Sequence, residues 1–146
     1  MNGACCPKTF RDKHLKDKYM GLFNSVKNMF SGSDTSEIWE MISDSSQVEP
    51  IIEASKEKPQ LIYKHSHRCS VCFVARGELE QSAEDIKEHA DMYFVNVVRN
   101  RDASNRIASE LDVRHESPQA ILIDQGEVVW HGSHGSINAD VMLEYF

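Results

Sequence analysis

The chain has 146 residues, 40% of them hydrophobic, and a formal net charge of −7 at pH 7. This size suits one globular domain with a substantial core, and the acidic balance argues against general nucleic-acid binding, which requires a basic surface. No apolar run approaches the roughly 20 residues of a membrane-spanning helix, and no apolar signal region precedes a cleavage site. We therefore expect a cytoplasmic protein in a reducing setting, where its four cysteines are more often catalytic or metal-binding than part of a disulfide framework.

Charge divides the chain into two parts. Residues 1–33 contain six Lys or Arg and two Asp, a balance of +4, whereas the remainder has 10 Lys or Arg against 21 Asp or Glu, a balance of −11. Apolar residues recur at helical spacing after Tyr19, and Ser31–Asp34 is typical of a linker. We expect residues 1–33 to be a basic arm with an amphipathic helix, and residues 34–146 to form the main domain. The helix either packs on that domain or contacts a partner or a membrane surface through residues 18–30.

Two short helices and a strand are expected next. Ser36 has the position of a helix cap, and Ser46 with Glu49 has the pattern of a capping box before Pro50. The apolar run Gln60–His65 predicts a buried strand.

After this strand, helical and strand patterns alternate up to the C-terminus. The expected elements are a helix over Cys72–Ala90, a strand over Met92–Val98, a helix over Ala103–Leu111, strands over Ala120–Ile123 and Val128–Trp130, and a helix over Asn138–Tyr145. We expect Phe73, Leu79 and Ile86 on the buried side of the first of these helices. The segment Asp124–Glu127, with glycine at its turn, joins the last two strands as a tight hairpin.

The resulting order from residue 60 is strand, helix, strand, helix, strand, strand, helix. Strands separated by helices run parallel and a tight hairpin is antiparallel, so we predict an α/β fold with a central mixed sheet flanked by helices. This is the arrangement of thioredoxin-like proteins. In such folds a cis proline precedes the hairpin, and the residue before it aligns an extended, disulfide-bonded partner. We therefore predict a cis peptide bond between Ser117 and Pro118.

Two cysteines at C-x-x-C spacing, Cys69 and Cys72, follow the strand Gln60–His65. A helix that begins near Cys69 would place both sulfurs in its first turn, where unpaired amides and the helix dipole favour a thiolate. The thiolate is the form that attacks disulfides, and two thiols at this spacing can close a small disulfide ring. The pattern predicts thiol–disulfide chemistry with Cys69 and Cys72 as the catalytic residues.

Residues around the cysteine pair have both a functional and a structural interpretation. Arg68 either supplies positive charge that favours the Cys69 thiolate or belongs to a solvated loop. His115 and Ser117, with Pro118, either hold substrate or only lead into the next strand. We expect substrate binding by these four residues, and we expect His65 and Trp130 to be structural.

Four segments resemble one family within the thioredoxin-like fold. They are Tyr63-Lys64-His65-Ser66, Asn100-Arg101-Asp102-Ala103-Ser104-Asn105, Val113-Arg114-His115-Glu116-Ser117-Pro118-Gln119 and Val128-Val129-Trp130-His131. These motifs resemble the YtxJ-type monothiol bacilliredoxins over roughly residues 36–146. The resemblance implies a protein that removes bacillithiol, or another low-molecular-weight thiol, from mixed disulfides on other proteins, with no cofactor beyond that thiol. Cys69 matches the cysteine of the family.

Members of that family usually lack a cysteine at the position of Cys72. Both a monothiol route, cleared by a free thiol, and a dithiol route, resolved by Cys72, stay open, and a general dithiol reductase is one alternative function. A non-catalytic zinc-binding or adaptor domain is an alternative of another class, with His65, His67, Cys5 and Cys6 as further zinc ligands. We expect no metal site, because Cys5 and Cys6 are adjacent to each other and remote from the C-x-x-C pair.

Overall fold

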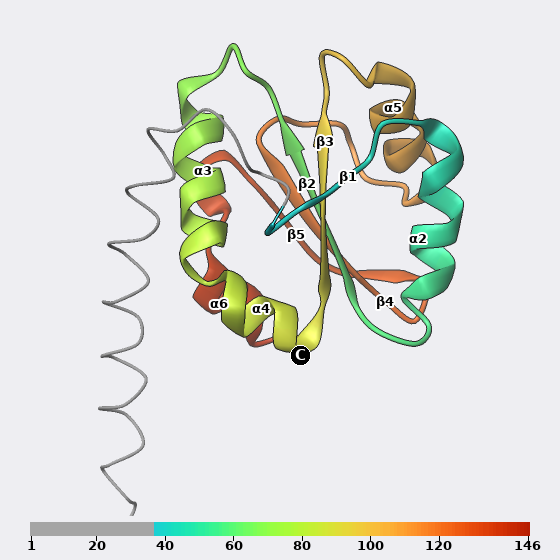
Figure 1. The fold of residues 1–146 in the computed structure, drawn as a ribbon, viewed down its shortest axis with the longest axis vertical. Coiled ribbons are helices and arrows are strands. Elements are labelled where there is room, and N and C mark those ends of the chain that lie inside the picture. Colours follow the sequence, from blue (N-terminus) through green and yellow to red (C-terminus); the bar gives the residue numbers. More distant parts are fainter. Residues whose placement is uncertain (1–36) are drawn as a thin grey trace, which may run out of the picture. The chain divides into compact units, whose positions relative to one another are not determined.

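The computed structural model describes residues 37–146, which form a five-stranded sheet with helices on both faces (Figure 1). The strands lie in the order β1-β3-β2-β4-β5. Their bounds are Glu40–Met41 (β1), Gln60–His65 (β2), Asp91–Asn96 (β3), Gln119–Asp124 (β4) and Glu127–Ser133 (β5). Strands β1, β3 and β2 run parallel, whereas β4 is antiparallel to β2 and β5 to β4, so the predicted mixed sheet is confirmed.

Helices on the two faces belong to separate hydrophobic clusters. Helices α3, α4 and α6 lie on one face of the sheet, and α2 and α5 lie on the other (Figure 1). The bounds are Val48–Ala54 (α2), Ser70–Gln81 (α3), Ala83–His89 (α4), Arg101–Glu110 (α5) and Ala139–Leu143 (α6), with 3₁₀ turns at Ser45–Gln47 (η1) and His134–Ser136 (η2).

Several predictions concern residues outside the described range. These are the basic arm over residues 1–33, the amphipathic helix with its contact through residues 18–30, the domain boundary at residue 34, and the roles of Cys5 and Cys6.

Strand β2 lies at the centre of the sheet and is buried on both faces. Leu61 and Tyr63 pack with Leu79 of α3 in one cluster, whereas Ile62 packs with Ile107 of α5 in the other. Consecutive strand residues point to opposite faces, so a strand covered on both sides reads as a nearly continuous apolar run. This explains why the sequence predicts β2 with the bounds that the structure has.

The helix predicted after Ser36 is wrong. Glu40 and Met41 instead form the edge strand β1, paired with β3, and Trp39 is buried before it. The indole Nε1 of Trp39 donates a hydrogen bond to Glu80 Oε1 at 2.8 Å. This anchor and the free edge of β3 give the segment non-local partners, which outweigh a local capping signal.

The second predicted helix forms as α2, but the capping residue is Asp44, which caps the preceding 3₁₀ turn η1, and not Ser46. Asp44 Oδ1 accepts a hydrogen bond from the Ser46 amide at 2.8 Å, and Gln47 Oε1 accepts one from the Asp44 amide at 2.9 Å. This reciprocal pair is a capping box. It begins η1, which leads directly into α2.

The single helix predicted over Cys72–Ala90 is two helices. The chain departs from helical geometry at Ser82, with φ −105° and ψ 15°, and α4 begins at the next residue. After this break Ala83 and Ile86 pack in the same cluster as α3. The apolar pattern therefore continues across a change of helix direction, which periodicity does not reveal.

Phe73 was expected to be buried, and this prediction is wrong. Its side chain is 45% exposed. The buried side of α3 consists of Cys72, Ala75 and Leu79, at spacings i, i+3 and i+7. Phe73 lies beside this stripe, because burial of Cys72 fixes the rotation of the helix.

The remaining predicted elements have the expected type and approximate position. Strand β3 ends at Asn96, two residues early, because Asn96 Oδ1 accepts hydrogen bonds from the amides of Val98 (3.0 Å) and Arg99 (3.1 Å). Such side-chain bonds to following amides replace strand pairing with a turn. Helix α6 begins after Asn138, whose Oδ1 accepts the Val141 amide at 3.1 Å.

The hairpin between β4 and β5 has a two-residue turn. Gln125 and Gly126 have φ of 53° and 80°, so both lie in the left-handed region used by type I′ turns. Ser55 anchors the turn: its carbonyl accepts the Gln125 amide and its hydroxyl accepts the Gly126 amide, both at 2.9 Å. Glycine at the second position avoids the strain that a Cβ atom would cause there.

Two glycine substitutions test the backbone geometry at the hairpin turn and within α3. Gly126→Ala should lower the free energy of unfolding by about 1 kcal/mol, because left-handed geometry is unfavourable for an L-residue. Gly77→Ala should raise it by about 0.5–1 kcal/mol, because Gly77 lies within α3 and a Cβ atom there meets nothing within 4 Å. Urea denaturation of the full chain measures both. A neutral Gly126→Ala variant would contradict the turn assignment.

Candidate active site

The cysteine pair lies where β2 ends and α3 begins. Cys69 is the N-cap residue of α3, with extended backbone (φ −120°, ψ 114°), and Cys72 lies in the first turn. The Cys69 amide donates to the Ser66 carbonyl at 3.2 Å, which closes the connecting loop. Cys69 is partly exposed, whereas Cys72 is fully buried. The two sulfurs therefore meet different environments although two residues separate them.

The surroundings shift the pKa values of the two thiols in opposite directions. The backbone amide of Cys72 lowers the pKa of the Cys69 thiol, assisted by the Cys72 side chain and the Val71 amide. Burial raises the pKa of the Cys72 thiol, and the neighbouring Cys69 adds to this rise. Amides at a helix N-terminus stabilise a thiolate, and an apolar interior opposes one. Cys69 is therefore the more readily ionised of the two.

Three groups surround the buried Cys72. The Ser66 amide donates a hydrogen bond to its sulfur at 3.4 Å, and Ser117 Oγ lies 3.5 Å from the same sulfur. On the backbone, the Tyr63 hydroxyl donates to the Cys72 carbonyl at 2.6 Å. Burial raises the pKa of the Tyr63 phenol far above its ordinary value, so it stays a donor at neutral pH. Tyr63 thereby ties the first turn of α3 to β2.

The loop that contains Ser117 and Pro118, here called the proline loop, adjoins the cysteine pair as predicted. The Ser117–Pro118 peptide bond is cis, which confirms the expectation from sequence. Pro118 is buried and its carbonyl accepts the His134 amide at 3.2 Å. Because Ser117 lies beside Cys72 Sγ, the structure brings Cys69, Cys72, Ser117 and Pro118 together at one edge of the sheet.

Arg68 and His115 have surroundings different from those expected of charges beside a thiolate. The Arg68 side chain is exposed, forms no hydrogen bond or ion pair within residues 37–146, and is not among the groups that shift the pKa of either cysteine. His115 instead contacts two residues on the α5 face of the sheet: its Nδ1 lies 3.3 Å from Lys64 Nζ and 3.2 Å from Ser104 Oγ.

Sequence reasoning missed two residues of this region, Tyr63 and Lys64. Both lie within an apolar strand pattern, where a tyrosine is ordinarily core and a lysine is ordinarily at a strand end. Lys64 is nevertheless fully buried. The sequence did contain a signal: Lys64 lies within a strand predicted to be buried, and a buried lysine needs polar partners inside the protein.

His65 and Trp130 are buried, as expected for structural residues. The His65 ring packs edge-on against Phe73, with ring centroids 4.9 Å apart, and lies 5.1 Å from Phe94. Burial lowers the pKa of His65 to about 4, so the ring is neutral at neutral pH. Neither of its ring nitrogens has a hydrogen-bond partner among the described residues.

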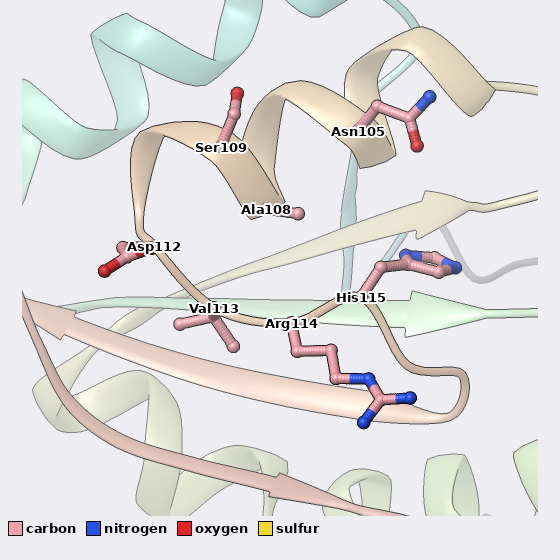
Figure 2. Close-up of a pocket in the computed structure, with 7 residues that line it drawn as sticks. All are labelled: Asn105, Ala108, Ser109, Asp112, Val113, Arg114 and His115. Atoms are coloured by element: carbon pink, nitrogen blue, oxygen red, sulfur yellow. The ribbon is translucent and has the colours of Figure 1, made fainter.

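An open depression of about 550 Å³ lies on the α5 side of the proline loop (Figure 2). Asn105, Ala108 and Ser109 line it from α5, and the segment 112–115 lines it from below. The cysteines are not part of this depression, so the chemistry of the site has a different location.

No metal or membrane feature appears in the described part of the chain. Within residues 37–146, no group of three or more His, Cys, Asp or Glu side chains is arranged to hold a metal ion. No helix of the same residues has the length and apolar character to cross a bilayer.

Alkylation tests the asymmetry of the two thiols. As pH is lowered from 9, iodoacetamide should continue to modify Cys69 after an ordinary thiol has ceased to react, because the pKa of Cys69 is lowered. Cys72 should react only on unfolding, because it is buried and the pKa of its thiol is raised. Peptide-level mass spectrometry separates these residues from Cys5 and Cys6. Faster labelling of Cys72 than of Cys69 would contradict the arrangement in which Cys69 is partly exposed and Cys72 is buried.

Comparisons with known proteins agree with this architecture. The chain resembles a solved structure titled as a candidate oxidoreductase with a thioredoxin fold, at 32% identity and a TM-score of 0.66, covering 75% of this chain and 94% of that one. It also resembles Fasciola hepatica thioredoxin, at 21% identity and TM-score 0.56 (72% and 93% covered). Thioredoxin O2 from Arabidopsis thaliana matches at 13% identity and TM-score 0.59 (77% and 93% covered). The latter two establish the fold alone.

The family match is more specific. The family model described as monothiol bacilliredoxin BrxC matches residues 40–142, which include both cysteines and the proline loop. Together with the fold and the position of Cys69, this match means that the chain belongs to the monothiol bacilliredoxin family of thioredoxin-fold thiol–disulfide oxidoreductases.

Proposed function

We propose that this protein removes bacillithiol, or a related low-molecular-weight thiol, from mixed disulfides on other proteins, with Cys69 as the nucleophile. The observation that carries the proposal is the combination of partial exposure and a lowered pKa at one sulfur, Cys69. A thiolate must reach a disulfide on another molecule, and Cys69 meets both requirements. Membership of the monothiol bacilliredoxin family supports bacillithiol as the small thiol.

The first step is a thiol–disulfide exchange. The Cys69 thiolate attacks the sulfur of the small thiol, a new disulfide forms between them, and the sulfur of the target protein leaves as a thiolate that takes up a proton from water. The target is thereby reduced. The small thiol remains bound to Cys69 as a mixed disulfide.

Two routes can clear this intermediate. In the monothiol route a second molecule of free thiol attacks the mixed disulfide, which releases an oxidised small-thiol dimer and restores Cys69. In the dithiol route Cys72 attacks Cys69, expels the small thiol and leaves a Cys69–Cys72 disulfide for an external reductant. The short separation of the two cysteines at the start of α3 favours the second route, whereas the raised pKa of buried Cys72 slows it. The dithiol route is shared with a general protein disulfide reductase.

The target protein is expected to bind across the proline loop. Ser117 and Pro118 border the cysteine pair, and the backbone before a cis proline is available to an extended segment. Arg68, exposed one residue before Cys69, and His115, two residues before Ser117, are the other residues proposed to contact the substrate. The partners are therefore proteins carrying mixed disulfides, in the reducing cytoplasmic setting expected from the sequence.

Single cysteine variants test the roles of the two sulfurs. Cys69→Ser should abolish release of the small thiol from a modified protein, because the nucleophile is gone. Cys72→Ser should retain partial activity through the monothiol route, and Ser70→Ala serves as a matched control between them. Turnover is followed as appearance of free target thiol. Full activity in Cys69→Ser would overturn the assignment of the nucleophile.

Adduct formation tests the class of small thiol. The protein is incubated separately with oxidised bacillithiol, oxidised glutathione and oxidised coenzyme A, and intact and peptide masses are then measured. We expect an adduct on Cys69 with bacillithiol, and in the Cys72→Ser variant this adduct should accumulate because no resolving thiol follows. An adduct only with glutathione or coenzyme A would contradict the bacillithiol assignment while leaving the oxidoreductase chemistry intact. Bound zinc, or no response of the thiols to oxidant, would favour the zinc-binding or adaptor alternative.

A further inference from the structure

Lys64 is a buried lysine beside the candidate site. It occupies β2 one residue after Tyr63 and is 0% exposed. Its Nζ donates a hydrogen bond to the Ser104 carbonyl of α5 at 3.0 Å and lies 3.3 Å from His115 Nδ1. No carboxylate within residues 37–146 forms an ion pair with it. Its polar contacts are thus a helix carbonyl and the imidazole that precedes the proline loop.

The direction of the Lys64–His115 contact follows from chemistry. An ammonium group has only donors, so His115 Nδ1 is the acceptor and the imidazole proton lies on Nε2. Ser104 Oγ, at 3.2 Å from the same Nδ1, can donate to it as well. His115 is an exposed residue and stands two residues before Ser117. A buried cation therefore holds the segment that enters the proline loop.

Neighbouring residues of β2 hold the two halves of the site from opposite faces of the sheet. Tyr63 binds the Cys72 carbonyl on the α3 face, and Lys64 binds His115 on the α5 face. The backbone of Lys64 also pairs with Gln119, which follows the proline. The position of Ser117 relative to Cys72 is thus fixed through one short piece of strand.

We propose that Lys64 is a positioning residue: through His115 Nδ1 it holds the segment before Ser117–Pro118 in the place where a protein substrate is aligned with Cys69. This inference rests on the proposed function, because it assigns the loop a substrate that Cys69 attacks. Lys64 itself touches neither cysteine. Its contribution is to the binding of the target protein, not to the reactivity of the thiolate.

Stability alone does not account for a lysine at this position. Taking an ammonium group out of water is costly, and apolar residues of similar volume often replace buried charges without loss of stability. A methionine side chain is similar in length to that of lysine, and it would pack on the face of the sheet where Ile62 lies. Lys64→Met should therefore fold with an unchanged or higher melting temperature. A loss of substrate binding in this variant then reports on the positioning of the loop and not on unfolding.

Protonation limits the pH range in which the contact between Lys64 and His115 is strong. Burial lowers the pKa of Lys64 to about 8, and burial, Lys64 and Arg101 lower the pKa of His115, while Glu116 opposes this. Below the pKa of His115 its Nδ1 is protonated and cannot accept; above about 8 Lys64 loses its charge. Alignment by Lys64 is therefore strongest between these two limits.

Nuclear magnetic resonance of the full chain, labelled with ¹⁵N at histidine, measures the contact without any turnover. In the wild type His115 should be the Nε2–H tautomer with a pKa below that of a free histidine. In Lys64→Met this pKa should rise, because a neighbouring positive charge is removed. Lys87→Met removes a lysine–carbonyl hydrogen bond from α4, at the opposite end of the sheet, and should leave His115 unchanged. An unchanged His115 in Lys64→Met would overturn the inference.

Steady-state kinetics with a protein mixed disulfide measure the consequence. Loss of a charge-assisted hydrogen bond should raise KM by roughly tenfold in Lys64→Met at neutral pH, with the alkylation rate of Cys69 unchanged. His115→Asn, which keeps an acceptor, should lose less than His115→Phe. An active wild type with the same KM in Lys64→Met would overturn the role of Lys64 and leave the proposed function standing. A wild type without turnover would overturn the proposed function and the role of Lys64 with it.

Discussion

Backbone amides at the first turn of α3 stabilise negative charge on Cys69, and this interaction requires the chain to stop being a strand and begin a helix within four residues. The loop after β2 meets that requirement with Cys69 in extended conformation as the N-cap. The amides of Val71 and Cys72 then lie next to its sulfur. Burial of Cys72 on the core side of α3 fixes the rotation of the helix, which leaves Cys69 partly exposed. The packing of α3 against the core thus also sets the surroundings of the Cys69 sulfur.

Strand β2 acts as the rigid reference for this geometry. Its successive side chains reach opposite faces of the sheet, so Tyr63 anchors α3 while Lys64 anchors the segment before the proline loop. The strand pairs with β3 on one side and β4 on the other, and it is buried along its whole length. Central strands of this kind open last in native-state fluctuations. Two parts of the site that are far apart in sequence are therefore held by adjacent residues of one central, fully buried strand.

Cys72 is a second cysteine in a family described as monothiol. It would give the proposed mixed disulfide on Cys69 a second route by which it can be cleared. Cys72 is buried, its thiol resists ionisation, and its sulfur accepts a hydrogen bond from the Ser66 amide and lies 3.5 Å from Ser117 Oγ. These features suit a thiol that stays protonated during the first exchange. In the proposed dithiol route, the sulfur of Cys72 would attack the mixed disulfide on Cys69 before a free thiol does.

The sequence by itself determined the order of elements from residue 60 onward and the cysteine pair, because these follow from local patterns: a nearly continuous apolar run at β2, glycine at the hairpin turn, and cysteines shortly after a strand. The cis proline and the family followed from the fold that this order predicts and from the motifs that the chain shares with one family. The sequence did not predict β1, whose partner β3 is about fifty residues away, nor the break at Ser82 or the outward direction of Phe73. Only the tertiary structure placed Lys64 against His115 and Tyr63 against Cys72. Such contacts depend on which residues the folded sheet brings opposite one another, and a local pattern carries no information about that.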